Sequence, residues 1–165
     1  MTTTRHSVKS SVHLSQAMPG YRGYSRSKMA TKTDRIFSEE ILSKLSETVA
    51  TVSRIKRVAG ADLDPDLVGS LDVIEEKAES LAQTIAGTAY EDHAGQKSLQ
   101  HGAGSQVMVL DSNILERVGH INQALAAFDL EGGTGITPED MDSVCDLLDD
   151  IRNSIKRREI MLNGR

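Results

Sequence analysis

A few residues in the sequence have side chains that could bind a metal ion. Glu116 and His120 are four positions apart, which places both on one side of a helix, one turn from each other. A di-iron site in a helical bundle needs carboxylates from four helices and two Glu-x-x-His pairs, and the sequence contains no such pair. The ligand set is too small, so we expect no metal centre of this kind and no cofactor.

A second candidate for ion binding lies between two apolar stretches near the C-terminal end. Apolar residues precede and follow an acidic, glycine-rich loop that contains Asp129, Glu131 and Asp140. This spacing resembles the helix–loop–helix of an EF-hand, which implies calcium ligands at these three carboxylates and the Gly135 carbonyl. Three positions depart from the pattern, because Gly133, Thr134 and Asp140 stand where a side-chain oxygen, a glycine and a glutamate are usual. The other interpretation is a plain connector between two helices.

The single cysteine, Cys145, lies beside a predicted apolar helix face. No histidine is close in sequence, and the acidic residues around it, such as Asp142 and Asp146, would raise a thiol pKa. We therefore predict an inert, buried thiol. No Ser-His-Asp arrangement can be assigned from spacing, so no catalytic residue is predicted and the chain is not expected to be an enzyme.

The charge of the chain is divided unevenly along its length. Residues 1–37 contain seven Lys or Arg and one acid, for a charge of +6, whereas residues 38–165 carry −11. The first segment is rich in Ser and Thr and shows no sustained helical or strand period. Such a segment buries too little apolar surface to offset its ordering entropy, so we expect a flexible basic arm that becomes ordered on a partner.

Aromatic and basic residues alternate within this arm, around Pro19 and Gly20. Tyrosine and arginine together can stack on bases and pair with phosphates, or anchor in a groove of an acidic protein. An organelle-targeting presequence has a similar composition. The residues predicted to bind a partner are Arg5, Lys9, Tyr21, Arg22, Tyr24, Arg26 and Lys28.

Residues 38–165 show the apolar spacing of helices. We predict helices over about 38–59, 65–86, 107–128 and 138–162, with a long loop over 87–106. Ser38, Asp64 and Thr137 are placed as N-caps, and Asp140 completes a capping box with Thr137. Equal lengths and short connections predict two antiparallel hairpins, and hence an all-α four-helix bundle.

Composition narrows the function classes. The chain has five aromatic residues, one cysteine and no run of about 18 apolar residues, so we expect no disulfide, no membrane span and no membrane partner. No cleaved signal peptide is apparent, which favours the cytoplasm or an assembled particle. We expect a non-enzymatic structural or assembly subunit, by analogy with components of phages and other particles. Its partners would be other protein subunits, including copies of itself. The alternative is a nucleic-acid-binding accessory protein acting through the arm.

Overall fold

The computed structural model describes residues 3–24, 27–59, 63–88, 103–130 and 137–163. Of residues 3–9, 27–28, 59, 129–130 and 163 it describes the backbone alone. The described residues form helices and contain no strand, which confirms the predicted all-α class. The helices are α1 (Thr3–Ala17), α2 (Ser27–Ala59), α3 (Pro65–Thr88), α4 (Ala103–Leu130) and α5 (Pro138–Asn163).

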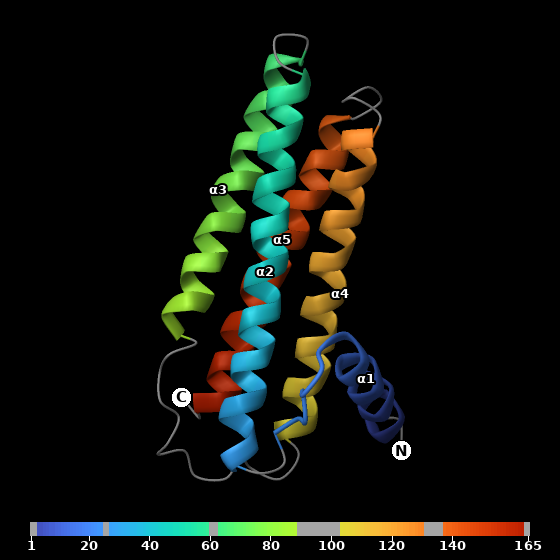
Figure 1. Cartoon of the computed structure of the whole chain (residues 1–165), viewed down its shortest axis with the longest axis vertical. Coiled ribbons are helices and arrows are strands. Elements are labelled where there is room, and N and C mark those ends of the chain that lie inside the picture. The colour runs from blue at the N-terminus through green and yellow to red at the C-terminus, as the bar shows by residue number, and fades with distance from the viewer. Residues whose placement is uncertain (1–2, 25–26, 60–62, 89–102, 131–136, 164–165) are drawn as a thin grey trace.

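Helices α2 to α5 form the predicted four-helix bundle (Figure 1). Helix α2 packs against α3 and α4, and α5 packs against the same two helices from the opposite corner. Helix α1 lies outside this bundle, against the half of α4 that comes first in the chain. The first turns of α2 and α4 therefore lie at the same end of the bundle as the last turns of α3 and α5.

The core consists of aliphatic residues spaced three and four positions apart on each helix. In α5 the buried apolar residues are Met141, Val144, Leu148, Ile151, Ile155 and Leu162. In α4, Leu110 and Phe128 continue the helical spacing of the apolar residues but are only half-buried. Each fully buried Leu or Ile contributes about 1.5–3 kcal/mol to the stability of the fold, so these rows of buried aliphatic residues hold the bundle together. The buried residues of α3 are Leu67, Leu71, Ile74, Ala78, Leu81 and Ile85.

Two predicted helix starts are confirmed by their hydrogen bonds. At α3 the backbone N–H of Asp66 donates to the Asp64 carboxylate at 2.8 Å. At α5 the N–H of Asp140 donates to the Thr137 hydroxyl at 3.2 Å, and the Thr137 N–H donates back to the Asp140 carboxylate at 2.9 Å. This reciprocal pair is the predicted capping box.

The predicted start of the first long helix at Ser38 is wrong. Helix α2 begins at Ser27, eleven positions earlier, and Ser38 is buried inside it rather than capping it. The earlier turns place Asp34 and Phe37 on the face that Ile41 continues. A buried aspartate on that face interrupted the apolar pattern, so the sequence suggested a helix boundary where none exists.

The N-terminal segment also differs from the expected flexible arm. Residues 3–17 form α1, and Leu14, Met18, Tyr21 and Tyr24 are buried against the rest of the same chain. The segment is ordered because a few large side chains find tertiary contacts, which its polar composition concealed.

Two other predictions can be compared with the described residues only in part. Of the long loop predicted over 87–106, residues 89–102 lie outside them, while 103–106 already belong to α4. Within the described helices, none is both long and apolar enough to cross a membrane.

Candidate functional site

Three charged residues are buried in the core at the end of the bundle where α1 docks. Asp111 of α4 is fully buried, and Asp34 of α2 and Arg158 of α5 are each 5% exposed. Each continues the three-and-four spacing of its helix, in line with neighbouring core residues. Those neighbours are Phe37 and Ile41 in α2, Val107 and Ile114 in α4, and Ile155 and Leu162 in α5.

Arg158 joins the two carboxylates. Its Nε donates to Asp111 Oδ1 at 2.6 Å, and its Nη2 donates to Asp34 Oδ1. The guanidinium carbon also lies 4.4 Å from the centre of the Phe37 ring, a cation–π contact. Burying charge is favourable only when it is paired and hydrogen-bonded, and these contacts meet that requirement for Arg158.

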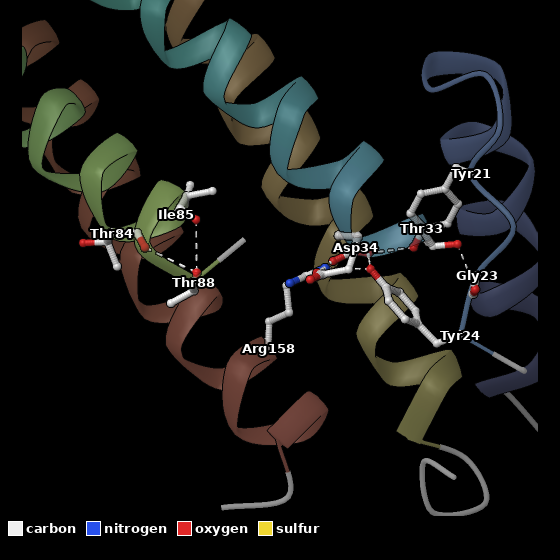
Figure 2. A network of polar contacts seen from close by, with 10 residues as sticks. Tyr21, Gly23, Tyr24, Thr33, Asp34, Thr84, Ile85, Thr88 and Arg158 are labelled. Carbon is white, nitrogen blue, oxygen red and sulfur yellow. Dashed lines mark hydrogen bonds and ion pairs between the residues drawn. The ribbon is translucent and has the colours of Figure 1, made fainter. Parts of the chain in front are cut away.

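Two tyrosines from the connector between α1 and α2 complete the cluster. The hydroxyls of Tyr21 and Tyr24 each donate to Asp111 Oδ2 at 2.7 Å. The Tyr24 hydroxyl also accepts a hydrogen bond from Arg158 Nη2 at 2.6 Å. Figure 2 shows Arg158 extending from α5 to meet Asp34 and Tyr24, with Tyr21 drawn above Tyr24. Asp111 therefore receives hydrogen bonds from three residues, two of them on the N-terminal segment.

The sequence Pro-Gly-Tyr-Arg-Gly-Tyr shapes the connector so that both rings point inward. Gly20 and Gly23 have positive φ values of 96° and 74°, a conformation that favours glycine. A Cβ at Gly23 would lie 2.7 Å from the sulfur of Met108, so a larger residue there would displace the Met108 side chain. The two tyrosine rings meet edge to face, with centroids 6.1 Å apart.

Thr33 fixes the connector to α2. Its hydroxyl donates to the Gly23 carbonyl at 3.1 Å and accepts from the backbone N–H of Arg22 at 3.4 Å. The tight turn is thus held on one side by α2 and on the other by α4.

Burial and neighbouring charges determine the pKa values of the groups in the cluster. Burial raises the pKa of Tyr21 and Tyr24 well above 10, and the nearby Asp111 carboxylate raises both further. Burial also raises the pKa of Asp111, which Arg158 and the tyrosine hydrogen bonds oppose. For Arg158 burial acts in the opposite direction, but Asp111 and the other neighbours outweigh it and leave the pKa well above its usual value. Neither tyrosine can release its proton near neutral pH.

The buried polar groups of the cluster form hydrogen bonds with one another. All members of the cluster are described residues, and none of their buried polar side-chain atoms is without a hydrogen-bond partner. Removing one partner from such a buried pair typically costs about 3–5 kcal/mol, because it leaves an uncompensated charge. The cluster is therefore built to fix the N-terminal segment on the bundle, and we call it the clasp, comprising Tyr21, Tyr24, Asp34, Asp111 and Arg158.

The residues predicted to bind a partner fall in three places. Tyr21 and Tyr24 lie in the clasp, while Arg22 is exposed between them. The side chains of Arg5, Lys9, Arg26 and Lys28 lie outside the described residues. The structure thus uses the two tyrosines for internal contacts.

The calcium candidate is described only in part. The Asp129 side chain and Glu131 lie outside the described residues, so their relation to Asp140 is not described. The carboxylate of Asp140 accepts hydrogen bonds from the Thr137 N–H and hydroxyl, which lower its pKa. Its observed role is that of a helix cap.

The other candidates show no arrangement suited to chemistry. Glu116 and His120 are both exposed on α4. Cys145 is half-buried, and burial raises the pKa of its thiol, with Asp142 and Asp149 adding to this effect. In the part of the chain that the structure describes, no group of three or more His, Cys, Asp or Glu residues could hold a metal ion.

The three charged members of the clasp are not among the site residues that the sequence predicts. Asp34 counts there only as the single acid of residues 1–37, and no role in the core is predicted for Asp111 or Arg158. The sequence nevertheless contained a signal for them. Each of the three residues stands three or four positions from apolar core residues of its own helix, where a buried side chain is expected. Charged residues at seam positions on three helices are unusual, since buried charges require partners.

No protein-family model matches the sequence, and no curated protein or solved structure is significantly similar to the chain.

Proposed function

We propose that this chain is a non-enzymatic structural or assembly subunit of a larger complex, such as a particle, in which the helical body packs on neighbouring subunits. The observation that carries the proposal is the closed clasp. Its buried charges and hydroxyls are satisfied by one another, so the most elaborate polar site among the described residues serves to hold segments of the chain together.

The shape of the bundle supports the same function. Helix α2 has 33 residues, which corresponds to a rod of about 50 Å at 1.5 Å per residue. The other bundle helices have 24 to 28 residues and pack alongside it. Long parallel sides and a fixed N-terminal segment offer extended surfaces to neighbouring subunits.

Purification from the native source tests this proposal. A tagged full-length chain should elute as part of an assembly and bring down the same partner chains, or further copies of itself, in stoichiometric amounts. The test variant is Arg158→Met, which opens the clasp and should reduce that recovery. The matched control is Arg157→Met, which alters the exposed neighbouring position. A chain that elutes as a monomer without stoichiometric partners would contradict the proposal.

Nucleic-acid binding is the second candidate, and the exposure of Arg22 and Lys32 at the α1 end of the bundle favours it. The clasp weakens it, because Tyr21 and Tyr24 are buried and cannot stack on bases in this conformation. Binding of short DNA or RNA at two salt concentrations decides the question. Tight binding that falls steeply with salt, and is lost on replacing Arg22 and Lys32 by glutamine, would favour this candidate.

A further inference from the structure

The two hairpins, α2–α3 and α4–α5, pack with parallel helices side by side. Helix α2 has α3 and α4 as its neighbours in the bundle, and α5 has the same two. Helices α2 and α4 run in the same direction along the bundle, and so do α3 and α5 (Figure 1). Two of the four neighbouring pairs are therefore parallel, which brings the like ends of their helix dipoles together.

The same hairpins have an alternative in which every neighbouring pair is antiparallel. It places α4 beside α3 and α5 beside α2, the order of a simple up-down-up-down bundle. Aliphatic residues at helical spacing face the centre in both arrangements, so their spacing does not select one. The length of the connection does not select one either. From Thr88 to Ala103 the chain can span up to about 50 Å, against about 8–10 Å between adjacent helix axes.

The side chain of Asn122 on α4 forms three hydrogen bonds with α2. Thr48 is fully buried, and its hydroxyl donates to Asn122 Oδ1 at 2.5 Å. Asn122 Nδ2 donates to the Lys44 carbonyl at 3.0 Å and to the Glu47 carboxylate at 3.2 Å. These bonds require α4 beside α2. They are lost in the all-antiparallel arrangement, where α2 and α4 stand at opposite corners.

An ion pair between α3 and α5 favours the same arrangement. Lys77 Nζ lies 2.5 Å from the carboxylate of Asp149. Arg117 of α4 lies at the same level of the bundle, because it pairs at 3.4 Å with the next residue of α5, Asp150. With α4 in the place of α5, Lys77 would face the like charge of Arg117 and lose its partner. The pair is partly exposed and contributes little, so the bonds of Asn122 are the main difference between the two arrangements.

We propose that Asn122, together with Thr48, selects the observed arrangement of the two hairpins over the all-antiparallel one. The charged residues of the clasp face the centre of the bundle, where all four helices meet, so they do not distinguish the two. A polar residue that is satisfied by one partner helix alone sets the helix alignment in the same way as a buried asparagine in a coiled coil. This inference goes beyond the proposed function and does not depend on it.

Cross-linking within the full-length chain reports which arrangement is present. In a Cys145→Ser background, Lys77→Cys/Asp149→Cys places one thiol on α3 and one on α5, which are neighbours in the observed arrangement. Lys77→Cys/Arg117→Cys places the thiols on α3 and α4, which are neighbours only in the alternative. Each chain is treated with a short reagent that joins two thiols, and the link is identified by mass spectrometry of the monomer.

Both cysteine pairs are combined with Thr48→Val/Asn122→Leu and, as the matched control, with Thr84→Val/Asn113→Leu, which makes the same changes at exposed positions. Replacing both partners of a buried hydrogen bond by apolar groups is nearly neutral for stability, so the first variant should fold. Its α3–α4 link should rise about tenfold over the control, because losing buried hydrogen bonds shifts an equilibrium by that order, and its α3–α5 link should fall.

An α3–α4 link no more frequent than in the control overturns the proposal. Should the double variant fail to fold, Asn122→Ala gives the second reading, because it removes the amide without adding an apolar side chain. The same rise of the α3–α4 link is expected, and its absence overturns the proposal as well. Neither result bears on the assembly proposal, which is tested by recovery of partners from the native source.

Discussion

The hydroxyl of Tyr21 lies 2.7 Å from the carboxylate of Asp111, although 90 positions separate the two residues in the chain. Through this hydrogen bond the N-terminal segment is tied to the core at one end of the bundle, at the same carboxylate that Arg158 binds from α5. The contact is fully enclosed, so water cannot replace either partner. The clasp should therefore contribute to the stability of the whole chain.

Replacing Arg158 by methionine should be strongly destabilising. It removes the positive charge from between Asp34 and Asp111 and leaves two buried carboxylates without their cation. The expected loss in unfolding free energy is about 3–5 kcal/mol, measured by urea denaturation. Arg157→Met is the matched control, because Arg157 is exposed on the same turn and its loss should cost about 0.5 kcal/mol or less. Equal losses in the two variants would mean that the buried ion pairs contribute nothing.

Stability should fall at alkaline pH because of Tyr21 and Tyr24. Their pKa values in the folded chain lie above the ordinary value of 10, so both remain protonated while tyrosines of the unfolded chain ionise. Their contribution is complete below pH 10 and is lost as the pH rises above it. The slope is about 1.4 kcal/mol per pH unit for each tyrosine.

Chemical denaturation at several pH values between neutrality and pH 11 measures this slope. The Tyr21→Phe/Tyr24→Phe variant is less stable at neutral pH but should show a flatter alkaline decline. If the decline is as steep in the variant as in the parent, other groups cause it.

The core of α3 gives a test of the bundle itself. Leu71→Asp places an unpaired charge in the fully buried seam and should cost several kcal/mol, above the range of about 0.5–3 kcal/mol for ordinary substitutions. Val73→Asp changes an exposed position two residues away and should be nearly neutral. Thermal unfolding followed by circular dichroism compares the two, and similar melting temperatures would mean that the buried face has been misassigned.

The sequence predicts the structure best in α3 and α5. The apolar residues of α3 recur at helical spacing without interruption, and those of α5 do so except at Arg158. That local pattern is enough to predict both helices and most of their buried faces. Asp34 and Arg158 form an ion pair across 124 positions, and no local pattern reports such a pairing. Because a charged residue is ordinarily solvent-exposed, Asp34 counts in the sequence only as the single acid among residues 1–37. Helix α1 was missed for the related reason that two buried residues, Leu14 and Met18, order an otherwise polar segment.

Cys145 should react slowly with a thiol reagent in the folded protein. It is half-buried, and burial raises the pKa of its thiol, so little thiolate is present near neutral pH. The rate should rise strongly in denaturant, when the side chain becomes accessible. Labelling as fast in the native state as in the unfolded state would indicate an activated cysteine.

A double-mutant cycle between Tyr21→Phe and Asp111→Asn tests the clasp most directly. Both single variants and the double variant are unfolded in urea, and the coupling energy is the amount by which their losses fail to add. If the tyrosine hydroxyl stabilises the chain through the Asp111 carboxylate, the coupling energy should be about 1.5–3 kcal/mol, the usual contribution of a hydrogen bond to a charged group. Losses that add within about 0.3 kcal/mol would show that the two residues act independently and would contradict the clasp.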